Sequence, residues 1–303
     1  MKTTVSLVLG SGGARGYAHI GVIEELQRRG YEVICIAGSS MGALVGGMCA
    51  ADRLMEYRDW VSHLSWMDVL KLMDVTLKRE GTIRGDKLLN KLRDIVGNPL
   101  IEDLPISFTA VATDITHQKE VWFQNGSLMN AIRASIAVPG FFTPVIEDER
   151  ILVDGGVLNP IPIIPTVAAH ADLIIAVDLN ADQSVLNIDL PTTKYLNRSG
   201  FSDDWTLDVT TINQQNGDAK NGQESIRSKM GGRLDILFSA VEVMQSSLGK
   251  YKMAGYPPDL LIDIPKDACR FYDFHRGLEM IELGRKLARM HLERLEMSMA
   301  NRY

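Results

Sequence analysis

Two successive units of apolar strand, glycine turn and helix open this chain, and they constrain its fold more than any other feature. The first unit has an apolar run at residues 5–9, a glycine-rich stretch at 10–16 and apolar residues at helical spacing over 17–29. The second unit has an apolar run at 33–37, a turn of small residues at 38–42 and a further small-residue helix. Because short apolar strands that alternate with helices pack as parallel neighbours, this order predicts a doubly wound α/β sheet.

The rest of the chain continues in regular elements up to residue 180 and then changes character. From about 181 to 231 the sequence is polar and has little periodicity, which predicts a loop, a lid or a disordered segment. We expect a single domain over residues 1–303, with a core at about 5–180 and C-terminal helices and a strand at 232–303. The patterns predict strands at 108–113, 120–123, 151–153, 173–177 and 260–264, and helices at 128–136, 234–252 and 276–298. Residues 60–78 are predicted to form an amphipathic helix or a pair of helices.

The composition excludes several classes of partner. The formal net charge is −6 and Lys and Arg form no run, so we expect neither a nucleic-acid partner nor a purely electrostatic membrane anchor. The three cysteines lie at unrelated spacings without a C-x-x-C pair, which predicts neither a disulfide framework nor a metal site. No apolar run approaches the ~20 residues that span a bilayer, and we interpret the chain as soluble and cytoplasmic.

A serine between two glycines is the strongest chemical signal in the sequence. The pattern Gly38-x-Ser40-x-Gly42 joins the second apolar strand to the helix after it. On such a strand-to-helix elbow the serine hydroxyl stands clear of the sheet, and the helix N-terminus favours negative charge on a substrate oxygen. The alternative is a turn of small residues that lets the helix pack closely on the sheet. The strand, elbow and helix in this order favour Ser40 as a nucleophile.

The glycine-rich stretch at 10–16 is the second signal. Successive small residues leave backbone N–H groups free to point into one concavity, which suits an oxyanion or a phosphate. A dinucleotide-binding fingerprint fails because Arg15 stands at its third glycine, and a phosphate-binding P-loop fails because no Gly-Lys-Ser/Thr follows. A ribose-binding carboxylate is also missing at the end of the second strand, where Ser40 stands. An oxyanion hole that faces Ser40 accounts for both loops.

Asp154-Gly155-Gly156, at the end of a predicted strand, is the third signal. Asp-Gly is a common turn dipeptide, so a purely structural role is the alternative. Because parallel strands deliver their carboxyl ends to one edge of the sheet, Asp154 is a candidate base for Ser40. A carboxylate is a weaker base than imidazole and would need desolvation and a short hydrogen bond to the serine. Asp114 and Asp178 also lie near strand ends and rank below Asp154.

The histidines allow a competing triad to be tested. An α/β-hydrolase needs its serine, acid and histidine in this chain order, which Asp154 followed by His170 or His275 satisfies superficially. That fold places several strands before its nucleophile, whereas two precede Ser40. We find a catalytic context at none of the six histidines, which are His19, His63, His117, His170, His275 and His291.

Taken in order, the three blocks at 10–16, 38–42 and 154–156 resemble those of the patatin-like phospholipase family. The stretches Tyr17-Ala18-His19-Ile20-Gly21, Pro139-Gly140 and Asn159-Pro160-Ile161-Pro162 add to the similarity. Residues 273–276 and the chain length look most like the bacterial RssA-type branch, which is related to neuropathy target esterase. The resemblance implies a three-layer α/β fold of the acyltransferase/lysophospholipase-like type, with a mainly parallel central sheet.

The resemblance also implies a chemistry. Ser40 would attack a lipid carboxylic ester and Asp154 would take and return the proton, with no cofactor and no metal. Its other implied site residues are the oxyanion-hole backbone at Gly12, Gly13 and Ala14, Arg15 as a nearby positive charge, and the motif glycines Gly38, Gly42, Gly155 and Gly156. One departure is that the family usually has glycine where Ser11 stands, which is tolerated if the φ of Ser11 is negative.

Two other functions stay open at this stage. The fold could serve a regulatory or lipid-binding protein with little hydrolase activity, because a fold and its motif can outlast an activity. Acyl transfer to an acceptor other than water is a third hypothesis. Residues 60–73 could line an acyl-chain groove or touch a membrane, but a buried helix face is favoured. The expected partner is a lipid or other acyl-ester substrate, whereas transient membrane contact and the oligomeric state are left open.

Overall fold

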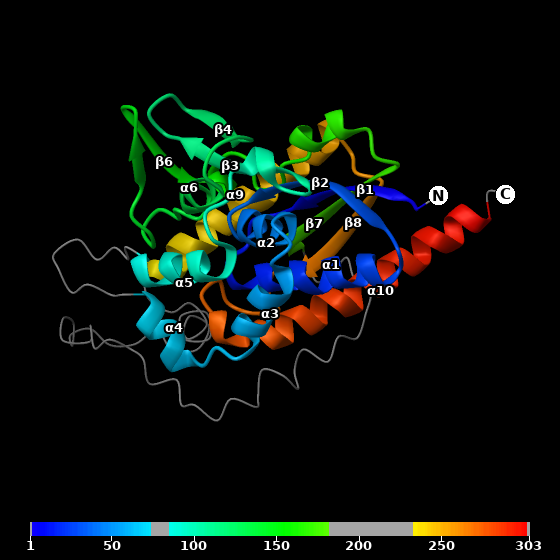
Figure 1. The fold of residues 1–303 in the computed structure, drawn as a ribbon, viewed down its shortest axis with the longest axis horizontal. Helices are drawn as coiled ribbons and strands as arrows, with labels where there is room; N and C mark the ends of the chain where they lie inside the picture. Colours follow the sequence, from blue (N-terminus) through cyan, green and yellow to red (C-terminus); the bar gives the residue numbers. More distant parts are fainter. Residues whose placement is uncertain (1, 74–84, 182–232, 302–303) are drawn as a thin grey trace, which may run out of the picture. The chain divides into compact units, whose positions relative to one another are not determined.

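The computed structural model describes residues 2–73, 85–181 and 233–301 (Figure 1). The chain divides into two compact units. The first comprises residues 1–186 and 244–303 and contains the sheet and the site described below. The second comprises residues 187–243, of which only 233–243 are described. The loop or lid predicted at 181–231 therefore lies outside the described residues, apart from Ala181 at the end of a strand.

The first unit is built on one central sheet. Its described strands run in the order β5-β6-β3-β2-β1-β7-β8, and β4 pairs with β3. The pairs from β3 to β8 through β2, β1 and β7 are parallel, whereas β4, β5 and β6 pair antiparallel at one side. The strands are β1 (Thr4–Leu9), β2 (Glu32–Ser39), β3 (Ser107–Asp114), β4 (Lys119–Phe123), β5 (Val145–Glu147), β6 (Arg150–Asp154), β7 (Leu173–Ala181) and β8 (Leu260–Pro265). The predicted mainly parallel sheet is confirmed.

Both faces of the sheet are covered, which gives the predicted three-layer α/β arrangement. Successive side chains of a strand point to opposite faces, and β1 illustrates this. Val8 packs with Ile161, Ile163 and the α9 residue Met253 on one face. Leu9 lies on the other face, toward α2. The described helices are α1 (Ala18–Arg28), α2 (Met41–Ala50), α3 (Leu54–Ser62), α4 (Trp66–Met73), α5 (Asp86–Val96), α6 (Leu128–Ser135), α9 (Arg233–Gly255) and α10 (Gly277–Ala300).

Of the helix or pair of helices predicted at 60–78, the structure has the pair. The structure has two shorter helices there, α3 and α4, and the first begins at Leu54. The break falls at 63–65, and Ser65 caps the start of α4 because its hydroxyl oxygen accepts from the Asp68 N–H at 3.3 Å, while the Asp68 carboxylate accepts from the Ser65 N–H at 3.1 Å. Residues 74–78 lie outside the described residues. The structure also adds α5 and β5, which the sequence patterns did not predict.

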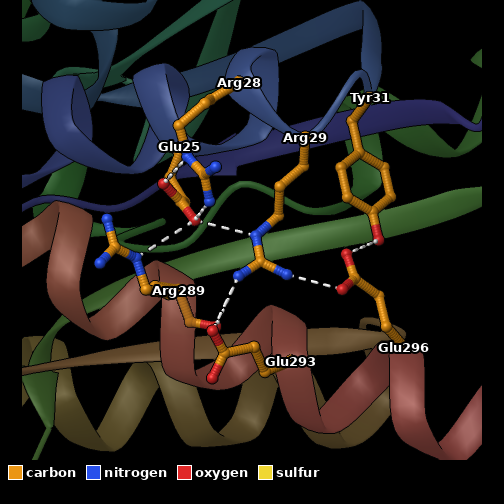
Figure 2. Close-up of polar contacts among 7 residues, drawn as sticks. All are labelled: Glu25, Arg28, Arg29, Tyr31, Arg289, Glu293 and Glu296. Atoms are coloured by element: carbon orange, nitrogen blue, oxygen red, sulfur yellow. Dashed lines mark hydrogen bonds and ion pairs between the residues drawn. The ribbon is translucent and has the colours of Figure 1, made fainter.

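A cluster of charges around the buried Glu25 joins α1 to α10 (Figure 2). Glu25 on α1 has a side chain with no exposed surface, and its carboxylate lies 2.6 Å from Arg28, 2.8 Å from Arg29 and 3.6 Å from Arg289 of α10. Hydrogen bonds from Arg28 lower the pKa of Glu25 to about 2, although burial opposes this shift. The complete cluster drawn in Figure 2 is Glu25, Arg28, Arg29, Tyr31, Arg289, Glu293 and Glu296.

Candidate active site

Ser40 occupies a strained position between a strand and a helix. β2 ends at Ser39 and α2 begins at Met41, and Ser40 between them has φ 56° and ψ −124°. Such a conformation costs a non-glycine residue on the order of 1–3 kcal/mol, so the surrounding structure must hold it. Ser135 does so, because its hydroxyl accepts a hydrogen bond from the Ser40 N–H at 2.9 Å and donates to the Val111 carbonyl at 2.6 Å.

The two glycines of the serine motif are required by close backbone approach. A Cβ added at Gly38 would lie 2.3 Å from the Gly42 carbonyl oxygen. A Cβ at Gly42 would lie 2.0 Å from the carbonyl oxygen of Leu9, at the end of β1. Both positions therefore exclude any side chain, and they let the turn at Ser40 press against the neighbouring strand end.

Asp154 lies at the end of β6 and is buried, with 2% of its surface exposed. Burial raises the pKa of Asp154 to about 7, although hydrogen bonding from the Ser40 hydroxyl and the Gly156 N–H opposes the shift. Oδ1 accepts from the Gly156 N–H at 2.7 Å, whereas Oδ2 has no aligned partner among the described residues. The structure thus brings Ser40 within reach of the carboxyl but does not align the two groups as a full hydrogen bond.

Gly155 and Gly156 press the Asp154 turn against its neighbours. A Cβ at Gly155 would lie 2.1 Å from the Val111 carbonyl oxygen and 2.5 Å from the hydroxyl of Ser39. A Cβ at Gly156 would lie 2.5 Å from both the Ser11 hydroxyl and the side-chain amide of Gln245. The Asp154 turn therefore packs closely between the turn at Ser40 and the glycine loop.

Within the glycine loop, Gly12 and Gly13 supply the available donors. Neither N–H makes a hydrogen bond to the residues that the structure describes, and Gly13 lines the same pocket as Ser40. The N–H of Ala14 instead donates to the Phe271 carbonyl at 2.8 Å. The predicted contribution of Ala14 to an oxyanion hole does not match this geometry, because its donor is already used.

Arg15, predicted as a nearby positive charge, lies in the glycine loop. Its guanidinium is buried and bonds the carbonyls of Gly12, at 3.3 Å, and Lys266, together with the Asn180 side chain at 3.2 Å. Through these contacts the Arg15 guanidinium bonds the backbone of the loop and its neighbours. Arg15 is not among the residues that line the pocket. Asn180 in turn donates to the Ser11 carbonyl at 3.1 Å. We therefore assign to Arg15 and Asn180 the role of holding the loop.

His19 holds the start of the glycine loop through a side-chain hydrogen bond. Its Nε2 donates to the Gly10 carbonyl at 2.9 Å, and burial lowers the pKa of His19 to about 4, so the ring is neutral at pH 7. The φ of Ser11 is not positive, so the departure from glycine at this position costs no backbone strain. The Ser11 N–H donates to the Pro160 carbonyl at 2.9 Å. The loop is thus fixed through its carbonyls as well as its N–H groups.

A pocket lies beside Ser40, which is one of its lining residues. Its side chains are apolar or aromatic except for the hydroxyls of Ser40, Tyr17 and Tyr57, and the two tyrosines hydrogen-bond each other. A mainly apolar lining with a few polar groups is typical of ligand pockets in proteins. The lining residues are Gly13, Tyr17, Ser40, Met41, Leu44, Tyr57, Trp60, Leu64, Val69, Leu72, Leu88, Ile136, Val138, Phe141, Phe142, Phe271 and Phe274.

The pocket changes the interpretation of residues 60–73. A buried helix face was the favoured prediction, but Trp60, Leu64 and Leu72 line the pocket. Other apolar side chains of α4 face solvent, and Met67 has 59% of its surface exposed. The apolar face of this helix pair therefore forms a pocket wall, which depends on aromatic side chains from distant parts of the chain.

The rival site residues have structural roles. Asp114 accepts from the N–H groups of Thr116 and His117 and from His117 Nδ1 at 2.8 Å, which closes the turn after β3. Burial would raise the pKa of Asp114, but the hydrogen bonds from His117 outweigh it and lower the pKa. Asp178 accepts from the Asn180 N–H at 2.9 Å and does not line the pocket. No histidine is among the pocket-lining residues.

In residues 2–73, 85–181 and 233–301, no three His, Cys, Asp or Glu side chains gather so that they could hold a metal ion. No helix in this part of the chain combines the length and the apolar character needed to cross a membrane.

The sequence patterns missed the residues that support the site. Asn180 follows a predicted strand, and its place at the carboxyl end of a parallel strand was a usable signal. Ser135, Phe271 and Gln245 lie in helices or loops without any motif, and only the fold brings them to the site.

A strained serine between a parallel strand and a helix, beside a glycine loop, is typical of α/β acyl hydrolases. The family model described as patatin-like phospholipase matches residues 7–167, and the chain belongs to this family. An uncharacterized NTE family protein of Mycobacterium tuberculosis is 42% identical, over 96% of this chain and 92% of the relative. The neuropathy target esterase sws of Drosophila melanogaster is 33% identical, over 59% of this chain and 13% of the relative. The family is one of lipid ester hydrolases.

A crystal structure of VipD from Legionella pneumophila is also similar. It has a TM-score of 0.38 and 16% identity, over 61% of this chain and 52% of VipD. A likeness this distant carries no argument about the site.

Proposed function

We propose that the protein is a serine carboxylic-ester hydrolase of the esterase or lysophospholipase type, with Ser40 as nucleophile and Asp154 as base. One observation carries this proposal. A strained serine lies in the wall of an apolar pocket, within reach of a buried carboxyl whose pKa is about 7. A base with a pKa near the working pH is the most effective proton acceptor, because it is ionised and still basic.

The reaction has two steps. Asp154 takes the proton of the Ser40 hydroxyl as Oγ bonds to the ester carbonyl carbon, and the carbonyl oxygen becomes an oxyanion. The N–H groups of Gly12 and Gly13 are the free donors that would hold this charge. The C–O bond to the alcohol then breaks, and Asp154 returns the proton to the leaving oxygen. Water attacks the acyl-enzyme with Asp154 again as base, which releases the acid and restores Ser40.

The pocket supports a substrate with an apolar acyl chain. Its wall offers aliphatic and aromatic surface beside Ser40, and burial of each methylene contributes about 0.8 kcal/mol to binding. Lysophospholipids and simple fatty esters are therefore the first substrates to test.

The Ser40→Ala variant tests the nucleophile. We expect a fall in ester hydrolysis on the order of 10⁴-fold or more, and loss of the stoichiometric labelling that a fluorophosphonate probe gives with the wild-type protein. Ser247→Ala, which removes an exposed serine of α9, is the matched control and should label and turn over normally. Undiminished turnover or labelling in Ser40→Ala would contradict the proposal.

The imperfect alignment of Ser40 and Asp154 favours one other candidate, a lipid-binding protein with little hydrolysis. Hydrogen bonds of catalytic groups are often long before substrate binds, so the alignment alone does not decide. Saturable binding of a fatty acid by a wild-type protein that is inert to fluorophosphonates would support that second function.

A further inference from the structure

A glutamine of α9 reaches both catalytic loops. Gln245 is 5% exposed, and its Nε2 donates to the Ser11 hydroxyl at 3.3 Å. The same Nε2 lies 2.5 Å from where a Cβ of Gly156 would stand. The Gly156 N–H in turn donates to Oδ1 of Asp154 at 2.7 Å. The glycine loop, the base turn and α9 therefore meet at the Gln245 amide.

A second polar connection runs from the same helix to the same turn. Lys252, seven residues further along α9, pairs with Oε1 of Glu120 on β4. Oε2 of Glu120 accepts from the Asn159 side chain at 2.8 Å, and the Asn159 N–H donates to the Gly155 carbonyl at 2.8 Å. Helix α9 thus holds the Asp154 turn at Gly156 through Gln245 and at Gly155 through Asn159.

The buried side-chain amide of Gln245 lowers the stability of the fold. Oε1 of Gln245 is buried and has no hydrogen-bond partner among the described residues. An unpartnered buried amide oxygen is unfavourable, and an apolar side chain of similar size would fill this place at lower cost. A polar residue here is better explained by the position it imposes on the two loops that it contacts.

We propose that Gln245 is a positioning residue for the reaction and that it acts through Ser11 and Gly156. It fixes the distance between the oxyanion donors and the Asp154 carboxyl, and Ser11, where the family usually has glycine, supplies its acceptor. This inference rests on the proposed Ser40–Asp154 hydrolase. Gln245 does not line the pocket, so it should affect the chemical step and not acyl-chain binding.

Kinetics of Gln245→Met and Ser11→Gly test the contact. A misplacement of about 1 Å near the reacting groups can cost about 100-fold in rate, so we expect Gln245→Met to lower kcat roughly 10- to 100-fold while KM changes less than about twofold. Ser11→Gly should lower kcat in the same direction. Because both changes break one contact, the double variant should be no slower than the slower single variant. Ser247→Ala on the same helix is the control.

Gln245→Glu tests whether position 245 lies close enough to Asp154 to influence its ionisation. A carboxylate beside Gly156 would disfavour ionisation of Asp154, so the acidic limb of the kcat/KM profile should move up by about half a pH unit or more. Gln245→Met should leave this limb where it is.

The outcomes separate this inference from the proposed function. An inert wild-type protein, measured with p-nitrophenyl esters and fluorophosphonate, would overturn the hydrolase itself. An active wild type together with folded Gln245→Met and Ser11→Gly variants of unchanged kcat would overturn only the role of Gln245. If Gln245→Met does not fold, as judged by circular dichroism, Ser11→Gly and Gln245→Glu decide: an unchanged kcat in Ser11→Gly or an unmoved acidic limb in Gln245→Glu would contradict the inference.

Discussion

At the scale of single residues, the site depends on a carboxyl that the fold destabilises in its charged form. Asp154 has its pKa raised from 3.8 to about 7 by burial, and the neighbouring donors reduce that shift only in part. The same burial that makes Asp154 a stronger base costs the folded protein free energy at neutral pH. Ser40 adds backbone strain at the adjacent loop. Both costs fall on the two residues proposed to react.

The pH dependence of hydrolysis should report this carboxyl. Because the base must be ionised, kcat/KM should rise with pH through a single ionisation with a midpoint near 7, and not near the 3.8 of an unperturbed aspartate. Initial rates with a neutral p-nitrophenyl ester between pH 5 and 9 check this. A profile that is flat down to pH 5 would contradict the assignment of Asp154.

The control for this profile is Asp154→Asn, which should abolish hydrolysis without loss of stability. The cost of the buried carboxylate is absent below its unfolded pKa of 3.8, grows as pH rises and is complete above about 7. The variant removes that cost, so its melting temperature at pH 8 should equal or exceed that of the wild type. A large decrease would show that Asp154 is needed for folding.

At the scale of secondary-structure elements, the sequence predicts the turns that consecutive residues form. It does not predict contacts between elements that lie far apart in the chain. The loop after β1 and the turn between β2 and α2 could be predicted because each is encoded by consecutive residues with a glycine pattern. The pocket could not, because its wall joins α3 and α4 to aromatic residues near Phe141 and Phe271. Amphipathic periodicity gives one apolar face but does not say whether that face meets a core or a cavity.

The wall formed by α4 should set the length of chain that the pocket accepts. Val69 is buried and lines the pocket, so Val69→Phe would fill part of it. Loss of two or three methylene contacts is worth about 2 kcal/mol, and we expect kcat/KM for long-chain p-nitrophenyl esters to fall tenfold or more, with acetate and butyrate esters nearly unaffected. Met67→Phe, on the exposed face of the same helix, is the control. Equal losses for short and long esters in Val69→Phe would contradict an acyl-chain pocket.

At the scale of the whole chain, the three motifs depend on segments that carry no motif themselves. The family match ends at residue 167, whereas Asn180, Gln245 and Phe271 hold the glycine loop from beyond it. Periodicity predicts the helix that becomes α10, but not that it lies along α1, because the pairing depends on charges more than 250 residues apart, such as Arg29 and Glu293. Figure 1 shows α1 and α10 side by side beneath the sheet.

The Glu25 cluster should therefore stabilise the packing of α1 against α10. At pH 7 Glu25→Gln leaves Arg28, Arg29 and Arg289 without a buried counter-charge. We expect the free energy of unfolding to fall by about 2 kcal/mol. This is less than the loss expected for a fully enclosed ion pair, because Arg28 is exposed to solvent. Glu282→Gln, which removes an exposed partner of Arg285 on α10, is the control and should cost less than about 0.5 kcal/mol.

The pH dependence of this difference identifies its cause. The pKa of Glu25 is lowered from 4.5 to about 2, so its contribution is complete above pH 4.5 and is lost as pH falls from 4.5 through about 2. Urea unfolding of wild type and Glu25→Gln at several pH values should show curves that converge in that window. If the two proteins differ by the same amount at pH 7 and pH 2, Glu25 acts through packing. The charge pairing between α1 and α10 would then contribute nothing measurable to stability.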